Sequence, residues 1–307
     1  MLAADGLLLE FEKGLNPQCL KDSPIPANII GYGEISVIFQ IADNSEVAFK
    51  RLPLFSDRPA AEKYIRRHHE YCDLLTGAGL TLPPHQTFII EPPQRPVTVY
   101  IGQRRLPAER FGNQLIHTSD SDNIRRLVEV IITEISKIWT FNRSHSPTLE
   151  LALDGQLSNW VWLAEQHDFV MIYIDTSTPL FRKEKIEQLD PELFLKSAPA
   201  FLRWILRLLF LEDVINRYYD QRQVYIDLVA NLYKEQRPDL IAMTLDIINH
   251  QLSADQEPLT VAEVAKYYRQ DKLIWALFLF FRRIDRWMTT RVLCRRYEFI
   301  LPGKIRR

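Results

Sequence analysis

Residues 31–50 read GYGEISVIFQIADNSEVAFK. An alternating apolar run follows the glycines, Asp-Asn-Ser is a turn signal, and the stretch returns to an apolar run that ends at Lys50. This pattern predicts a β-hairpin with a glycine turn at its entrance. Gly31 and Gly33 allow turn angles that a side chain would forbid, and they let backbone amides approach an anion closely. Taken alone, such a turn is more often only a turn.

The residues after this hairpin predict a small β-rich region. Residues 60–76 place charged positions around aromatic and aliphatic ones without an internal proline or glycine, which predicts a helix ending at Gly77. Two short apolar runs, 87–90 and 97–101, predict strands joined by the proline-rich connection EPPQRP. The first hundred residues therefore predict the order β, β, helix, β, β.

The remaining sequence predicts a mainly helical region. Residues 123–141 are apolar over much of a helical circumference, as expected of a central helix. Short strands are expected at 157–163 and 169–174, and almost everything after Pro191 is expected to form an α-rich bundle.

Two apolar runs in this region, 200–211 and 273–281, predict buried helices. They do not fit a membrane span, which needs about 20 apolar residues. The basic tail, 282–307, allows two interpretations: a surface for an anionic partner, or the solvated side of a helix. In the second interpretation, the buried side of that helix would consist of Ile284, Trp287, Met288, Val292 and Leu293.

Composition limits the classes of function. The chain has 307 residues, 47% hydrophobic and 25% charged, and can bury a large core. A formal net charge of -1 gives no overall field to attract nucleic acid, and no nucleic-acid partner is expected. The three cysteines lack zinc or disulfide spacing and favour a reducing cytoplasm, and the first residues are not typical of a secretory signal. The histidines show no His-x-x-x-His spacing, so no zinc site is predicted.

Lys50 would extend a cation from a half-buried strand, as phosphate binding requires. Glu70, on the following helix, can pair with this ammonium and hold it extended. Glu62 is a rival acid on the same helix, and an exposed strand lysine is the plainer alternative.

Two further acidic positions follow apolar segments. Asp154 precedes Asn159 by five residues, which places a carboxylate that can accept a hydroxyl proton beside an amide oxygen that can bind a divalent metal. Asp175 ends an apolar strand, where a carboxylate is costly unless it is paired, and magnesium is one suitable partner. The plainer alternatives are an Asp-Gly turn and a helix cap.

Taken in order, these residues resemble the protein-kinase-like superfamily. The compact Asp154 loop is most similar to its small-molecule branch, the aminoglycoside and choline phosphotransferases. This resemblance implies a two-lobed α+β fold, with a small β-rich N-lobe in residues 1–102 and a larger, mainly helical C-lobe in residues 103–307. The residues that carry it are Gly31, Gly33, Lys50, Glu70, Asp154, Asn159 and Asp175.

The resemblance also implies roles on the nucleotide side. Gly31 and Gly33 would lie in the loop over the phosphates, Lys50 would contact the α- and β-phosphates, and Glu70 would orient Lys50. The implied cofactors are ATP and Mg²⁺, with GTP left open.

On the acceptor side, Asp154 would be the catalytic base, and Asn159 with Asp175 would hold magnesium. The hinge that reads adenine would lie near Ile101 and Gln103. The implied reaction moves the γ-phosphoryl group to a hydroxyl of an acceptor, with a lean toward a small molecule.

Three departures from the family pattern are present. Ser36 occupies the place of a third glycine, Ala152 lies where the catalytic loop usually has a histidine, and Asp175 is followed by Thr176-Ser177. These departures leave two alternatives open. One is a catalytically degenerate pseudokinase that binds a nucleotide or another protein. The other is an unrelated α+β scaffold, in which Lys50, Glu70 and Asp175 would not share a cleft.

Overall fold

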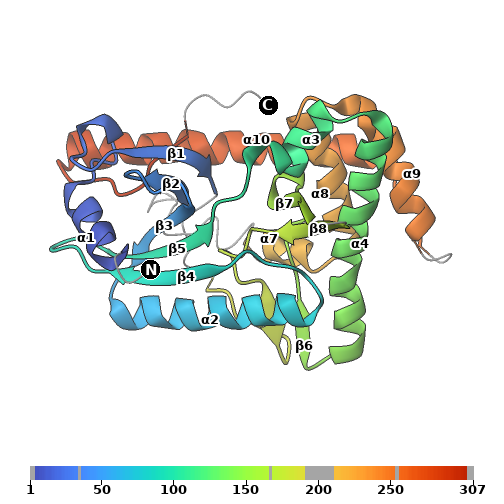
Figure 1. Cartoon of the computed structure of the whole chain (residues 1–307), viewed down its shortest axis with the longest axis horizontal. Helices are drawn as coiled ribbons and strands as arrows, with labels where there is room; N and C mark the ends of the chain where they lie inside the picture. Colours follow the sequence, from blue (N-terminus) through green and yellow to red (C-terminus); the bar gives the residue numbers. More distant parts are fainter. Residues whose placement is uncertain (1–3, 34–35, 166–167, 191–210, 253–255, 303–307) are drawn as a thin grey trace.

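The computed structural model describes residues 4–33, 36–165, 168–190, 211–252 and 256–302. An antiparallel five-stranded sheet forms one end of the molecule and a group of helices forms the other (Figure 1). The sheet has the order β1-β2-β3-β5-β4. The prediction of an α+β chain with a β-rich N-lobe and a helical C-lobe is confirmed. The strands of the sheet are β1 (Ala27–Tyr32), β2 (Val37–Ile41), β3 (Val47–Phe55), β4 (His85–Ile90) and β5 (Val97–Arg104).

The two faces of this sheet are covered by different helices. Helix α1 (Ala4–Gly14) covers one face, where its Leu8 and Phe11 join a buried cluster with Phe39 and Phe49. Helix α2 (Arg58–Gly77) lies along the other face (Figure 1). Because successive strand residues point to opposite faces, Lys50 is directed to the α2 side. The alternation in β3 therefore sets the direction of this lysine.

The C-lobe is built around helix α4 (Ser121–His145), whose apolar side packs into the largest core cluster. Two small sheets carry the segments between α4 and the later helices: the hairpin β7–β8 and the three-stranded sheet β10-β9-β6. The strands are β6 (Leu149–Leu151), β7 (Trp160–Glu165), β8 (Asp168–Tyr173), β9 (Phe181–Lys183) and β10 (Ile186–Glu187). The other helices are α3 (Gly112–Thr118), α7 (Leu211–Tyr218), α8 (Gln221–Lys234), α9 (Ile241–Gln251) and α10 (Val261–Trp287).

Helix α10 is less buried over residues 273–281 than the sequence predicts. Leu273, Leu277 and Phe280 are 61%, 47% and 55% exposed, and Trp287, in the predicted buried side of the basic tail, is 60% exposed. The first turns of α10 pack into the helical bundle, where Val264 is buried in the main core cluster, and the helix then continues along the N-lobe, which explains the exposure of its later residues (Figure 1). The predicted helix at 200–211 lies outside the described residues, apart from Leu211. None of the described helices combines the length and the apolar character that a bilayer span requires.

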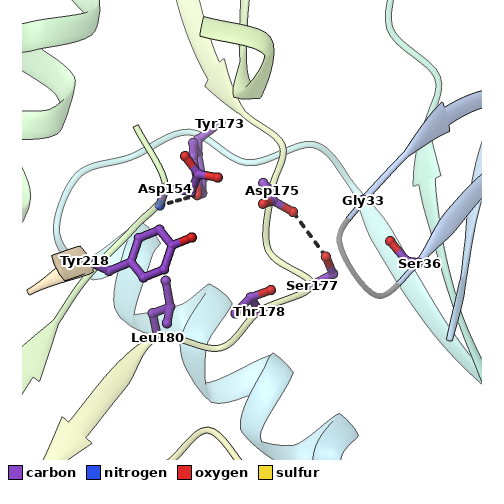
Figure 2. Close-up of a pocket in the computed structure, with 9 residues that line it drawn as sticks. All are labelled: Gly33, Ser36, Asp154, Tyr173, Asp175, Ser177, Thr178, Leu180 and Tyr218. Atoms are coloured by element: carbon purple, nitrogen blue, oxygen red, sulfur yellow. Dashed lines mark hydrogen bonds between the residues drawn. The ribbon is translucent and has the colours of Figure 1, made fainter. Parts of the chain in front are cut away.

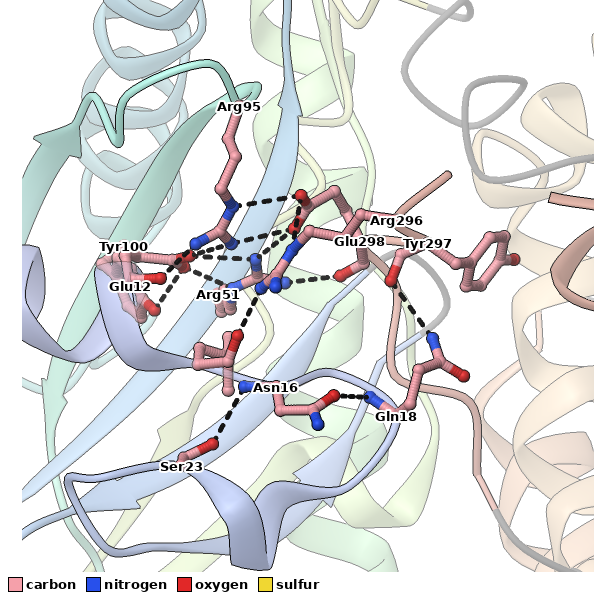
Figure 3. Close-up of polar contacts among 11 residues, drawn as sticks. Glu12, Asn16, Gln18, Ser23, Arg51, Arg95, Tyr100, Arg296, Tyr297 and Glu298 are labelled. Carbon is pink, nitrogen blue, oxygen red and sulfur yellow. Dashed lines mark hydrogen bonds and ion pairs between the residues drawn. The ribbon is translucent and has the colours of Figure 1, made fainter. Parts of the chain in front are cut away.

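A buried ion-pair network joins both ends of the chain to the N-lobe sheet (Figure 3). The Arg51 guanidinium is fully buried and donates to both carboxylate oxygens of Glu12, while Arg95 donates to Glu12 and Glu298. The Tyr100 hydroxyl donates to Glu12 at 2.7 Å. Burial acts to raise the pKa of Glu12, but the charge of Arg51 and the hydrogen bonds outweigh it and leave this pKa lowered. The segment that follows α10 is thereby tied to α1 and β3.

Candidate active site

The central contact of the site joins the two lobes. Lys50 Nζ, on β3, lies 2.9 Å from Asp175 Oδ1 and 3.2 Å from the Ser177 hydroxyl. Ser177 in turn donates to Asp175 Oδ1 at 3.1 Å. Burial acts to raise the pKa of Asp175, but the charge of Lys50 and the hydrogen bonds from Lys50 and Ser177 hold it below its usual value. Asp175 is therefore ionised at neutral pH and is held by a cation.

The segment that carries Asp175 is also held by side chains from two further elements, β5 and α2. The Gln103 amide, on β5, donates to the Ile174 carbonyl at 3.2 Å and to the Thr176 hydroxyl at 3.3 Å. From α2, the Tyr64 hydroxyl donates to the Ser177 carbonyl at 2.7 Å. These contacts hold a short polar segment in one place without a helix or strand of its own. The pair Thr176-Ser177, noted in the sequence only as a departure, thus supplies polar contacts on both sides of Asp175.

Asp154 lies at the start of a compact loop before β7. Its backbone N–H donates to the Tyr173 hydroxyl at 3.2 Å, and its Oδ1 accepts from the Gln156 N–H at 3.0 Å. The Asn159 side-chain amide donates to the Asp154 carbonyl at 3.2 Å, and the Asn159 carbonyl accepts from the Ile174 N–H at 3.0 Å. The loop is therefore closed on itself and joined to the residue before Asp175.

The residue two positions before Asp154 is held from α2. Ala152 is fully buried, and its carbonyl accepts from the Tyr71 hydroxyl at 2.8 Å. Its N–H donates to the Leu180 carbonyl at 3.0 Å. Tyr71 therefore braces the loop at the position where the family pattern has a histidine. No local pattern predicts this contact, because 81 residues separate Tyr71 and Ala152 in the chain.

Gly33 and Ser36, at the facing ends of β1 and β2, line the other side of the pocket. The Gly33 N–H donates to the Ser36 carbonyl at 3.0 Å, and a Cβ on Gly33 would lie 2.5 Å from the Ser36 hydroxyl oxygen. Gly31 lies within β1, opposite Ile38. Figure 2 shows the lining side chains around a common opening, with Asp154 and Asp175 across from the hairpin tip. They are Gly33, Ser36, Asp154, Tyr173, Asp175, Ser177, Thr178, Leu180 and Tyr218.

Glu70 does not contact Lys50 here. It forms an ion pair with Lys183 on β9, and its side chain is 39% exposed. The rival acid Glu62 lies 3.8 Å from Arg58 at the exposed start of α2. Toward the site, α2 instead presents His68, which is fully buried and lies 3.1 Å from the Thr176 hydroxyl. Burial and then nearby positive groups lower the pKa of His68 to about 3, so its ring is neutral.

The two residues expected at the adenine hinge lie inside the N-lobe. Ile101 is fully buried in an apolar cluster beneath β3 and β5, opposite Lys50 in the register of the two strands. Gln103 is 8% exposed, and its side-chain amide donates to the Ile174 carbonyl in the segment that carries Asp175. Among the described residues, the lining of the pocket that contains Asp154 and Asp175 includes neither of them.

The fold and this site define a two-lobed α+β chain whose polar pocket lies at the junction of the lobes. Residues 21–286 match the model of a family described as a family of unknown function, DUF6206, and the chain belongs to this family. No curated protein matches the sequence.

Two solved structures are similar in overall arrangement at low identity. One is WaaP in complex with acyl carrier protein, at 15% identity and a TM-score of 0.31, covering 70% of this chain and 88% of that one. The other is the GDP and kanamycin complex of APH(2")-IIia, at 10% identity and a TM-score of 0.34, covering 81% and 98%. The ligands in these titles belong to those two proteins.

Proposed function

We propose that the chain is a kinase-like phosphotransferase that moves the γ-phosphoryl group of ATP to a hydroxyl of a small acceptor. One observation carries the proposal: Lys50 and Asp175 pair across the lobes, in the pocket that Asp154 and the tip of the glycine hairpin also line. A cation, two carboxylates and glycine backbone amides are the groups that phosphoryl transfer requires.

The proposed roles follow from the chemistry of each group. Asp154 accepts the proton of the attacking hydroxyl, since its backbone is held by Tyr173 and its carboxylate borders the pocket. Lys50 binds the α- and β-phosphates, and its ion pair with Asp175 weakens when it does so. The amides at the hairpin tip, near Gly31 and Gly33, approach the phosphates.

The donor set also fits magnesium. Asp175 offers carboxylate oxygens. The Asn159 side-chain nitrogen donates to the Asp154 carbonyl, so the side-chain oxygen of Asn159 is the atom that can bind a cation. Hard oxygen donors of this kind suit Mg²⁺, which in phosphoryl transfer neutralises charge on the phosphates. For Glu70 to orient Lys50, nucleotide binding must break its ion pair with Lys183 and bring it to Lys50.

Asp154→Asn tests the proposed base. Nucleotide turnover is measured with ATP or GTP, magnesium and a panel of hydroxyl acceptors, with a thermal-shift titration run beside it. The expected result is turnover in the wild type that falls by about 10²-fold or more in Asp154→Asn, while the nucleotide-dependent thermal shift remains. Equal turnover in the variant removes Asp154 from the mechanism.

The second candidate is a pseudokinase that binds a nucleotide or a partner without turnover. It is favoured by the pairing of Glu70 with Lys183 and by Ala152, which stands where protein-kinase-like proteins usually have a histidine. In that case the wild type binds nucleotide in the thermal-shift titration, but no acceptor supports turnover, and Asp154→Asn behaves like the wild type.

A further inference from the structure

A second cluster of ligating groups lies between α2 and β4, next to Thr176. His68 and Cys72 are four residues apart on α2 and therefore lie on one face of the helix. His85 is the first residue of β4 and approaches them from the sheet. One ligand atom from each of the three lies within 4.8 Å of the others.

The spacing of these atoms suits a small cation. Cys72 Sγ lies 3.7 Å from His68 Nε2. Zinc binds sulfur at about 2.3 Å and nitrogen at about 2.0 Å in tetrahedral sites, so its ligand atoms are about 3.3–3.8 Å apart. His85 Nδ1 lies 3.2 Å from the Pro83 carbonyl, to which only a protonated nitrogen can donate. The unprotonated nitrogen of His85 is then Nε2, and a backbone carbonyl holds the ring as second-shell partners do in metal sites.

Burial sets two of these ligands apart from the other histidines and cysteines. His68 is fully buried, whereas His69, His117, His145 and His250 are exposed. Cys72 is also buried, at 4% exposed, whereas Cys19 and Cys294 are exposed.

We propose that His68, Cys72 and His85 bind one borderline transition-metal cation of the Zn²⁺ class, with water as a fourth ligand. Two imidazoles and a thiolate are donors that select such a cation, whereas the oxygen donors at Asp175 and Asn159 suit magnesium. This proposal differs from the sequence expectation of no zinc site. His-x-x-x-His spacing is not needed here, because the helix pair is a histidine with a cysteine and the third ligand comes from a strand.

The site lies beside the Asp175 segment. The Thr176 hydroxyl, directly after Asp175 in the chain, lies 3.1 Å from His68 Nε2. Because a cation bound to Nε2 replaces this hydrogen bond, Thr176 would keep its bond from the Gln103 amide, and the cation would fix α2 to β4. The inference does not depend on phosphoryl transfer, since it concerns metal binding alone.

Cobalt(II) is the probe. The full chain, purified with any affinity tag removed and under reducing conditions, is stripped with a chelator and titrated with Co²⁺ while the absorption spectrum is recorded. We expect one equivalent to bind, with a thiolate-to-cobalt charge-transfer band and visible bands of tetrahedral cobalt, and Zn²⁺ to displace it. Cys72→Ser removes the charge-transfer band. His85→Gln, at a half-buried position, keeps the band and weakens Co²⁺ binding by at least about tenfold.

The controls are matched by chemistry. Cys19→Ser removes an exposed thiol, and His250→Ala removes an exposed histidine on α9. Both are expected to bind Co²⁺ as the wild type does. The proposal is overturned if folded wild type shows no thiolate band, if the band survives Cys72→Ser, or if His85→Gln binds with unchanged affinity. If Cys72→Ser does not fold, His85→Gln decides.

Discussion

Lys50 Nζ lies 2.9 Å from Asp175 Oδ1, although 125 residues separate the two in the chain. The pair joins β3 of the sheet to the end of β8 in the helical lobe. Ser177 contacts both partners, and Gln103 and Tyr64 hold the segment on either side. The junction of the lobes is therefore organised around one ion pair that borders an open pocket.

Lys50→Met is expected to lower the free energy of unfolding by about 1.5–3 kcal/mol without nucleotide, because it removes a hydrogen bond between charged groups and leaves Asp175 with Ser177 alone. Urea denaturation measures this loss. The double variant Lys50→Met/Asp175→Asn should be less destabilised than the sum of the single variants, since both remove the same interaction. Lys13→Met, which breaks an exposed ion pair with Glu10, is the control and should change stability by less than about 1 kcal/mol. Additive losses in the double variant would show that the pair contributes nothing.

Stability should depend on pH through Asp175. Its pKa is lowered in the folded chain, so the contribution of its ionised form is fully present above the unfolded value of about 3.9 and is lost as the pH falls through the folded value. The difference in unfolding free energy between wild type and Asp175→Asn should therefore be largest near neutral pH and should shrink below about pH 4. Denaturation series at several pH values give this difference directly. A difference that is constant, or that grows in acid, contradicts the assigned ion pair.

Glu12→Gln should be among the most destabilising single changes in the N-lobe. It removes the fully buried carboxylate that binds both Arg51 and Arg95 and leaves Arg51 with Glu298 as its carboxylate partner, and breaking a buried ion pair in this way costs about 3–5 kcal/mol. Glu10→Gln, on the same helix, is a matched control, because Glu10 is exposed and its pair with Lys13 is worth less than about 1 kcal/mol. The two variants are compared by chemical denaturation. Equal stabilities would mean that Glu298 alone compensates the charge of Arg51.

Gly112→Ala should disturb the Asp154 loop from a distance. A Cβ at residue 112 would lie 2.6 Å from the Leu157 carbonyl oxygen, which is backbone between Asp154 and Asn159. Because backbone must move to relieve the contact, we expect a loss of about 1–3 kcal/mol. Gly77→Ala is the control, since a Cβ there meets nothing within 4 Å. It should leave stability unchanged or raise it by up to about 1 kcal/mol. A neutral Gly112→Ala would show that α3 does not support the loop.

Much of the fold was accessible from local patterns. Alternation over 37–41 and 47–50 predicted strands, and proline-free amphipathic runs predicted α2 and α4. The strands around Asp154 and Asp175 were predicted because each is a short apolar run next to a turn signal. Helix α1 and the small sheet of β6, β9 and β10 were missed, since these elements are short and their stability comes from tertiary packing.

The site was less accessible than the fold. The positions of Lys50 and Asp175 could be inferred, because each comes at the end of a short apolar run in the sequence and the two occur in a recognisable order. The partners of these residues could not, since Tyr64, His68 and Tyr71 are separated from their contacts on the Asp175 and Asp154 segments by between 81 and 113 residues. No local pattern records such contacts. For the same reason the pairing of Glu70 with Lys183 could not be distinguished in the sequence from a pairing with Lys50.

The most direct test of the proposed nucleotide site is a thermal-shift titration with ATP and GTP, with and without magnesium, on wild type, Asp175→Asn and the exposed control Asp43→Asn. A ligand that binds only the folded state at 100 times its Kd stabilises it by about 2.7 kcal/mol. We predict a magnesium-dependent rise in melting temperature for wild type and Asp43→Asn that is lost in Asp175→Asn. No rise at millimolar nucleotide, or a rise that Asp175→Asn retains in full, would contradict the assignment of this pocket to a magnesium-bound nucleotide.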